Sequence, residues 1–284
     1  MTITPTPNHR GDPRWLPEVL RAYGVTTREL PGWLDWGMGD FGVIQGIVVH
    51  HTGHNATSAE YIARNPGLGN GLSSQIQLSR DGVATLCGAG IAWHAGRGSH
   101  PGWPTNDANR VSIGIEAQSD GTSAWPQVEL DAYYRICAAI LYKLGKRATP
   151  QTLISHWEYS LQAQGKWDPG AGNGVSGARM EMGTFRARVN WHIDNPPWQT
   201  APAPKETPVI FDQITTFIKG YLGPQIDAIQ EIWRQLRGPG GTGWPQLGKN
   251  AAGQNLSLVD AIAAIRQEQA AQRTILEKLS KGGK

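Results

Sequence analysis

The sequence is poor in cysteine, in net charge and in long apolar runs. Its two cysteines, Cys87 and Cys137, have no metal-type spacing, so we expect two reduced, buried thiols rather than a disulfide framework or a thiolate site. A net charge of +3 over 284 residues is too small to favour nucleic acid as a partner. No apolar run approaches the roughly 20 residues of a membrane span, so we expect a protein that is not embedded in a membrane.

The first 15 residues, MTITPTPNHRGDPRW, also lack a basic segment followed by an apolar one. That pattern is typical of a secretory signal, so the expectation is a chain without one, made in the cytoplasm. If it acts outside the cell, it then needs another route out.

Tryptophan and glycine, in contrast, are plentiful, and the positive charge is unevenly placed. There are 12 tryptophans, whose flat apolar faces suit both protein cores and grooves for carbohydrate or peptide. From Lys205 onward there are ten Lys or Arg and seven Asp or Glu, whereas the residues before it hold 16 of each sign. Any weak preference for an anionic surface therefore lies in the C-terminal part.

Composition predicts four segments. Residues 1–40 form an N-terminal helix and an irregular lead-in, of which 1–10 are expected to be disordered, and residues 41–195 form the main domain. Residues 196–208 contain five prolines and are typical of a semi-rigid linker. Residues 209–284 form a helical C-terminal region.

Apolar periodicity predicts an α/β fold with a mixed β-sheet flanked by helices, followed by a small all-helical C-terminal region. The predicted elements are a first helix capped by Asp12, a strand over 46–50, a short helix capped by Thr57 or Ser58, a hairpin over 75–87, a strand over 111–116, and helices over 128–145 and 179–193. The predicted C-terminal helices are 209–222, 226–236 and one beginning near Leu256.

The last helix carries a heptad pattern with two readings. Its residues at alternating steps of four and three are Leu258, Ile262, Ile265, Gln269, Gln272, Leu276 and Leu279. Such spacing is typical of a coiled-coil strand used for self-association. A helix that packs back on the tail's own bundle would show the same spacing.

Three residues suggest a metal site. A hydrolytic zinc site needs three protein ligands and one open position for water. The segment from Ser155 to Gly170 supplies His156 and Asp168, and the strand over 46–50 ends at His50. His51 follows at once, but neighbours on a strand point to opposite faces, so only one of the two can reach the metal, and we expect His50.

These segments, taken together, resemble the zinc N-acetylmuramoyl-L-alanine amidases, the family that also includes the peptidoglycan-recognition proteins. The resemblance covers about residues 41–194. Its matching pieces are IVVHHT at 47–52, SRDG at 79–82, WHAG at 93–96, SIGIE at 112–116, and His156 with KWDPG at 166–170. Residues 12–36 are similar to the lead-in of lytic enzymes from bacteriophages of actinobacteria.

The resemblance implies a fold and a set of roles. The fold would be a mixed sheet with helices against it and Zn²⁺ at one edge, bound by the three residues named above. Glu116 would be the general base and Lys166 would stabilise the oxyanion. Some relatives use a tyrosine near the first hairpin strand, where this chain has Ser74, so the proton transfer would fall to Glu116. His94 would line the substrate groove, although a purely structural, hydrogen-bonded histidine also fits.

The activity implied is hydrolysis of the amide between N-acetylmuramic acid and L-alanine in bacterial peptidoglycan, for lysis of a phage host. The protein would stay in the host cytoplasm until lysis, depend on a holin, and then reach the cell wall. Two alternatives stay open: a peptidoglycan-binding protein without catalysis, and a zinc endopeptidase acting on the stem peptide. The C-terminal region would bind the cell wall or mediate self-association.

Overall fold

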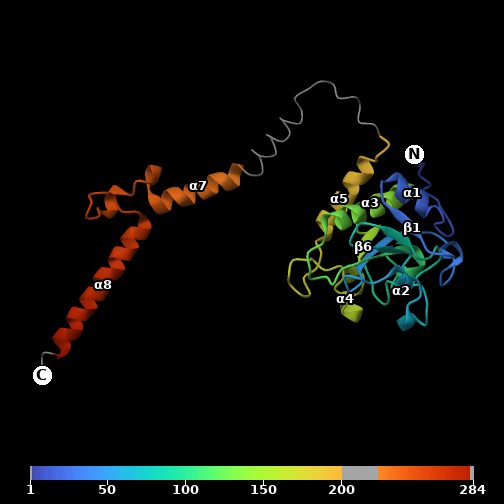
Figure 1. The fold of residues 1–284 in the computed structure, drawn as a ribbon, viewed down its shortest axis with the longest axis horizontal. Coiled ribbons are helices and arrows are strands. Elements are labelled where there is room, and N and C mark those ends of the chain that lie inside the picture. Colours follow the sequence, from blue (N-terminus) through green and yellow to red (C-terminus); the bar gives the residue numbers. More distant parts are fainter. Residues whose placement is uncertain (1, 200–222, 282–284) are drawn as a thin grey trace, which may run out of the picture. The chain divides into compact units, whose positions relative to one another are not determined.

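The computed structural model of the protein describes residues 2–199 and 223–281. The chain divides into an N-terminal unit, Met1–Ala201, and a C-terminal unit, Pro202–Lys284. The N-terminal unit contains the β-sheet and its covering helices, and the described part of the C-terminal unit is helical (Figure 1). The predicted class, a mixed sheet flanked by helices with a helical C-terminal region, is confirmed.

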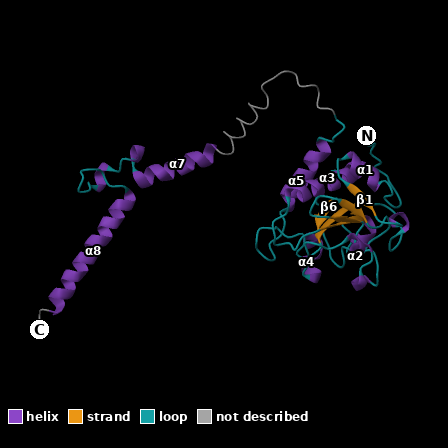
Figure 2. Cartoon of the chain, viewed as in Figure 1, coloured by secondary structure: helices purple, strands orange, loops and turns teal. Residues whose placement is uncertain are grey.

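Six short strands form the sheet of the N-terminal unit (Figure 2). Their order is β1-β4-β3-β5-β2-β6, and every neighbouring pair is parallel except the antiparallel β3 and β4. The strands are β1 Thr27–Glu29, β2 Gly46–His51, β3 Ile76–Leu78, β4 Ala84–Leu86, β5 Ser112–Ala117 and β6 Leu153–Ser155. Parallel neighbours require crossovers, and here helices and loops provide them.

Helices cover both faces of the sheet (Figure 1). On one face α1 Leu16–Ala22, α3 Gln127–Lys143 and α5 Met182–Asp194 enclose the main hydrophobic core. On the other face lie α2 Ala59–Ala63 and α4 His156–Gln164 with smaller clusters. All six residues of β2 are buried, as expected for a central strand covered on both sides. Short 3-10 turns lie at Trp33–Asp35, Pro66–Leu68 and Ala108–Val111.

The elements predicted around the site are confirmed. The apolar run at 46–50 is β2, the hairpin is β3 with β4, and the strand at 111–116 is β5. Ser58 caps α2 by accepting a hydrogen bond from the backbone N–H of Tyr61, at 3.2 Å. Both cysteines are reduced and buried, as expected.

The N-terminal lead-in differs from the prediction. The first helix begins at Leu16 without a side-chain cap, because Asp12 accepts a hydrogen bond from the backbone N–H of Phe41 instead, at 2.9 Å. Residues 1–10 were expected to be disordered, but Ile3 is buried in the main core. The backbone N–H of Thr6 donates to the carbonyl of Lys143 at 2.6 Å, so the lead-in is tied to the end of α3.

The N-terminal unit also extends beyond residue 195. Trp198, placed by its sequence in the linker, packs edge-on against Tyr23 and Tyr142, with ring centroids 5.1 and 5.3 Å apart. The proline-rich segment therefore begins as part of this unit. Most of the predicted linker and the predicted helix over 209–222 lie outside the described residues.

The described part of the C-terminal unit contains two long helices, α7 Gly223–Arg237 and α8 Leu258–Lys281, joined by a loop with 3-10 turns at Pro239–Gly241 and Pro245–Leu247. The indole of Trp244 donates to the carbonyl of Gln235 at 3.0 Å, and the backbone N–H of Trp244 donates to Leu256 at 2.8 Å, which ties the loop to both helix ends. Within the described ranges, no helix combines the length and the apolar character that a membrane crossing needs.

Candidate metal centre

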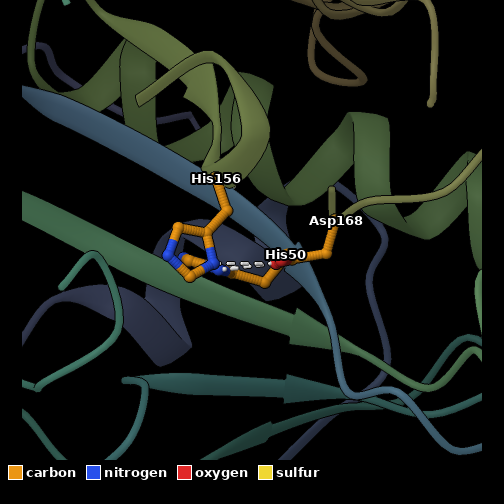
Figure 3. A group of neighbouring side chains, drawn as sticks. All are labelled: His50, His156 and Asp168. Atoms are coloured by element: carbon orange, nitrogen blue, oxygen red, sulfur yellow. Dashed lines mark hydrogen bonds and ion pairs between the residues drawn. The ribbon is translucent and has the colours of Figure 1, made fainter. Parts of the chain in front are cut away.

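Three side chains from separate parts of the chain meet at one edge of the sheet (Figure 3). Oδ2 of Asp168 lies 3.1 Å from Nδ1 of His50 and 3.0 Å from Nδ1 of His156. One candidate ligand atom from each residue lies within 4.8 Å of the other two, and all three residues are buried. The structure therefore brings together the three residues that the sequence predicts as ligands.

The position of His50 follows from the geometry of β2. Ile47 and Val49 pack into the main core, so the alternation of the strand turns Val48 and His50 towards the opposite face. In the parallel pairing of β2 with β5, His50 is in register with Glu116. Both residues therefore lie side by side on the face away from α3.

His156 and Asp168 are fixed by the start of α4. Ser155, the last residue of β6, accepts from the backbone N–H of Glu158 at 3.2 Å, and the Glu158 carboxylate accepts from the backbone N–H of Ser155 at 2.9 Å. This capping box sets His156 at the first helical position. The carbonyl of Asp168 accepts from the backbone N–H of Trp157 at 2.9 Å, which returns the loop after α4 to the helix start.

An ion pair between helices supports the capping box from outside. Arg186 on α5 holds Glu158 through Nη2–Oε1 at 2.9 Å and Nη1–Oε2 at 3.1 Å. Both side chains are largely buried, at 14% and 11% exposed. A two-point contact of this kind holds the carboxylate in a single orientation, so α5 helps to define where α4 begins.

The outward nitrogens of both histidines are hydrogen-bonded. Nε2 of His156 donates to the carbonyl oxygen of Ala95 at 3.2 Å. Nε2 of His50 lies 3.1 Å from Nδ1 of His94, whose own Nε2 donates to the carbonyl oxygen of Ser112 at 3.2 Å. A carbonyl can only accept, so neutral His94 carries its hydrogen on Nε2 and accepts from His50 at Nδ1.

This chain of hydrogen bonds determines which nitrogens are free. With hydrogens on their Nε2 atoms, neutral His50 and His156 both present an Nδ1 lone pair to the carboxylate of Asp168. The pKa of His50 is lowered to about 4: burial is the largest cause, the charge of a protonated His156 adds to the fall, and the contact with Asp168 opposes it. Near neutral pH His50 is therefore uncharged, so its Nδ1 lone pair is available to a cation in place of a proton.

A cation is the natural occupant of such a site. Two His nitrogens and one carboxylate oxygen are the donor set of a catalytic zinc site with one open position. Ligands about 2.1 Å from a tetrahedral ion are about 3.4 Å apart, a few tenths of an ångström more than the observed 3.0 and 3.1 Å. The hydrogen-bonded outer nitrogens match the support that metal-bound histidines usually receive. The residues present therefore fit Zn²⁺.

Asp168 is in the form that a ligand requires. Burial alone would raise its pKa, but its contacts with His156 and His50 outweigh burial and hold the pKa below the ordinary value. The carboxylate is thus ionised across the neutral range. For His94, burial is the main cause that lowers its pKa well below the ordinary value, followed by the charge of a protonated His50.

Glu116 stands beside the three ligands with an unused oxygen. Its Oε2 is buried and has no hydrogen-bond partner among the described residues. Burial raises the pKa of Glu116 well above its usual value, the charge of Asp168 adds to the rise, and Lys166 opposes it. A carboxylate in this setting is a stronger base than one in water, which suits proton transfer.

The remaining predicted residues occupy different positions. Lys166 is exposed at the rim, close enough for its charge to act on Glu116. His94 is only 5% exposed, so it offers little surface to a substrate and instead contacts His50. His51 points away from the three ligands: its Nδ1 accepts from the backbone N–H of Gly170 at 3.0 Å, and its ring packs against Trp167. Ser74 is fully buried.

Sequence reasoning missed the residues that hold His94 in place. Gly114 on β5 makes room for the ring, because a Cβ there would lie 2.7 Å from Cγ of His94. Asn109 accepts from the backbone N–H groups of His94 and Ala95 at 3.1 and 2.7 Å. The acceptors at Ala95 and Ser112 are backbone carbonyls, for which a sequence carries no side-chain signal.

Two segments of the chain match known families. Residues 40–171 match the family described as N-acetylmuramoyl-L-alanine amidase. Residues 210–274 match the family described as the Rv3766 C-terminal domain. The chain is also 63% identical over 43 residues to the uncharacterized protein Rv3766 of Mycobacterium tuberculosis (strain ATCC 25618 / H37Rv), which is 15% of this chain. The match spans only 16% of the length of that relative.

The chain is also similar to several solved structures. A selenomethionine derivative of AmpD is 21% identical, with 57% of this chain and 94% of that one covered and a TM-score of 0.41. The catalytic domain of XlyA is 20% identical, with 58% and 99% covered and a TM-score of 0.40. The amidase LysC from Clostridium intestinale URNW is 15% identical, with 58% and 97% covered and a TM-score of 0.40.

Proposed function

We propose that the protein is a zinc-dependent amidase of bacterial peptidoglycan, on the basis of the match of residues 40–171 to the family described as N-acetylmuramoyl-L-alanine amidase. It hydrolyses the amide bond between the lactyl group of N-acetylmuramic acid and the L-alanine of the stem peptide. The observation that carries this proposal is the convergence of His50, His156 and Asp168, with their free electron pairs directed at one point.

In this proposal Nδ1 of His50, Nδ1 of His156 and a carboxylate oxygen of Asp168 hold Zn²⁺. Bound zinc lowers the pKa of a coordinated water to about 7 and polarises a carbonyl. The protein's own contribution is to keep the three donors deprotonated and correctly oriented. The hydrogen bonds to His94 and Ala95 and the capping box at Ser155 perform this task.

Glu116 and Lys166 divide the remaining work. The unpartnered oxygen of Glu116 accepts the proton of the attacking water and delivers it to the leaving amine of L-alanine. The Lys166 ammonium, on an exposed side chain, stabilises the negative charge that develops on the scissile carbonyl oxygen. The reaction is a balanced hydrolysis: the amide C–N bond breaks, the carbonyl carbon gains the hydroxyl of water, and the nitrogen gains the proton.

Mass spectrometry of digested cell wall tests the proposal. Purified peptidoglycan is incubated with the protein, with and without a zinc chelator, and the released products are weighed. Intact stem peptides beginning at L-alanine, released only without chelator and again after zinc is restored, are the expected result. Shorter peptide fragments would identify an endopeptidase instead, and no release at any zinc concentration would identify a binding protein without catalysis.

We propose phage-induced lysis as the biological setting. The protein would accumulate in the cytoplasm of an actinobacterial host and reach the wall through a pore protein of the holin type. The resemblance of residues 12–36 to lytic enzymes of actinobacteriophages supports this setting. Expression inside an actinobacterium should cause lysis only when a holin is co-expressed; lysis without it would contradict the delivery route, and survival with it would contradict the lytic role.

For the C-terminal unit we propose a role in holding the cell wall. The support is the positive charge after Lys205 and the exposed indole of Trp233, 56% accessible on α7. Sedimentation with insoluble wall compares the full chain with a chain ending at Ala201. Equal retention of the two would refute this role, whereas weaker retention of the shorter chain, most evident at raised salt, is expected.

A further inference from the structure

The helix α8 has an apolar stripe that the other described residues of the C-terminal unit leave exposed. The helix extends as a straight rod away from the loop that joins it to α7 (Figure 1). Ile262, Ile265, Leu276 and Leu279 are 51%, 55%, 65% and 68% exposed. In proteins most helical stability comes from packing of the apolar face, and an exposed apolar stripe along a 24-residue helix marks a surface for a partner.

These four residues fall on a single heptad seam, which Val259 and Ile275, each 58% exposed, flank at positions e and g. Positions a are Ile262, Gln269 and Leu276, and positions d are Leu258, Ile265, Gln272 and Leu279. Helices that repeat apolar residues every 3.5 positions pack knobs into holes along such a seam. The two glutamines give polar layers in the middle, which reduce stability and favour one register over shifted ones.

The charges beside the seam are self-complementary. Glu268 occupies a g position and Arg273 the e position five residues later, which is the spacing at which opposite charges meet between two parallel strands. An antiparallel pair would instead place Glu268 near its own copy and Arg266 near Arg273 of the other strand. The pattern therefore favours a second identical helix in parallel orientation.

Another segment of the same chain fits this seam less well. The other long described helix of the C-terminal unit, α7, has 15 residues and is about 23 Å long, whereas α8 is about 36 Å long. It could cover little more than half of the seam. A second copy of α8 matches the full length, the polar layers and the charges at once.

We propose that the protein self-associates through α8, which forms a parallel two-stranded coiled coil with α8 of a second copy. Two copies then present two N-terminal units on one assembly. For a substrate as extensive as a polymer surface, two linked units raise the effective concentration of each at the wall. The pairing itself rests on the sequence and exposure of α8 and does not depend on the proposed catalytic activity.

Light scattering after size-exclusion chromatography of the full chain measures the pairing directly. The unaltered protein should have twice the mass of one chain. Ile265→Lys places a charge in the seam and should give a single-chain mass, whereas the matched control Ala264→Lys, one residue away on the outer face, should stay paired. A single-chain mass for the unaltered protein would overturn the proposal, as would an unchanged mass for Ile265→Lys.

A charge exchange tests which partner occupies the seam. Glu268→Arg should raise the dissociation constant of the pair on the order of tenfold. The new arginine of each strand would face Arg273 of the other strand, so each dimer would contain two repulsive contacts. Adding Arg273→Glu should restore most of the affinity. These residues are five positions apart and do not face each other on one helix, so rescue requires a second strand. Failure of the double variant to recover would exclude the parallel pair.

Cross-linking tests the orientation. Leu279→Cys puts a thiol at the last d position, where two parallel strands in register bring identical residues into contact. Mild oxidation should give a covalent dimer on a non-reducing gel, since both native cysteines are buried and unavailable. An antiparallel pair would keep the two new thiols at opposite ends, and absence of cross-linking in a sample of double mass would overturn the parallel assignment.

Peptidoglycan digestion by the same Ile265→Lys variant separates this proposal from the proposed function. The substitution is far from the three candidate ligands, so release from short soluble fragments should stay within about twofold of the unaltered chain. A chain that pairs but releases nothing would refute the amidase and leave the pairing intact. A chain that releases stem peptides but never pairs would refute the self-association and leave the amidase proposal intact.

Discussion

The two units use the same apolar residues in opposite ways. In the N-terminal unit Leu141 on α3 is fully buried, whereas Leu276 on α8 in the C-terminal unit is 65% exposed. The buried set encloses a sheet whose edge holds three side chains in a fixed arrangement. The exposed set presents a surface. One unit can therefore hold a rigid site, while the described part of the other leaves apolar surface free for a partner.

The largest effect is expected from Asp168→Ala. The substitution removes one of three candidate zinc ligands and the only charged one, so release of stem peptides should fall on the order of 10³-fold or below detection. Zinc content after dialysis, measured by atomic emission, should fall with it. Asp194→Ala, on the exposed surface of the same unit, is the matched control. Full activity of the Asp168 variant would remove the metal site from the mechanism.

Identical substitutions in the two units should differ widely in their effect on folding. Leu141→Ala should lower the free energy of unfolding of the N-terminal unit by about 2–5 kcal/mol, because it leaves a cavity in a closed core. Leu276→Ala should leave that free energy unchanged and weaken only self-association. Urea unfolding, followed in each unit by hydrogen exchange and mass spectrometry, separates the two. Equal losses in the N-terminal unit would show that the units are not independent.

A smaller effect is expected at His94. Its ring receives the Nε2 hydrogen of His50 and thereby keeps Nδ1 of His50 free for the metal, so we infer a positioning role. His94→Asn should weaken zinc binding about 10- to 100-fold. A colorimetric chelator in competition measures this affinity without any substrate. The control is His100→Asn, which changes a half-buried histidine outside the three ligands. Unchanged zinc affinity of the His94→Asn variant would contradict the positioning role.

Local pattern predicted those parts of the site that depend on local structure. His50 ends a short, β-branched apolar run that favours a buried strand, and the alternation of that strand separates His50 from His51. Ser155 and Glu158 carry a capping-box pattern that fixes where α4 begins, but this pattern was not used, and neither β6 nor α4 was predicted from the sequence. These features depend on neighbours within a few residues, so the sequence carries them directly.

Contacts between distant residues were not predictable in the same way. Asp12 has the sequence of a helix cap, but its carboxylate is taken by Phe41, 29 residues later. Trp198 lies among prolines yet packs on Tyr23, because an exposed indole next to a core finds apolar surface. The burial of His94 depends on the missing side chain of Gly114 on another strand. Such contacts become visible only when the sheet is assembled.

Acid should affect the two units differently. In the metal-free N-terminal unit the pKa of His50 is lowered to about 4, below the value of about 6.5 in an unfolded chain. Between these values the unfolded state binds a proton that the folded state does not, so stability is complete above pH 6.5 and falls as the pH drops towards 4. At pH 5 the loss from His50 is on the order of 1–2 kcal/mol.

The C-terminal unit contains no histidine, so its helices should change little between pH 7 and 5. Hydrogen exchange of the metal-free protein, corrected for intrinsic rates, reads both units in one sample. His50→Asn should reduce the acid sensitivity of the N-terminal unit, and an equal loss in both units would mean that a source other than this buried histidine governs it.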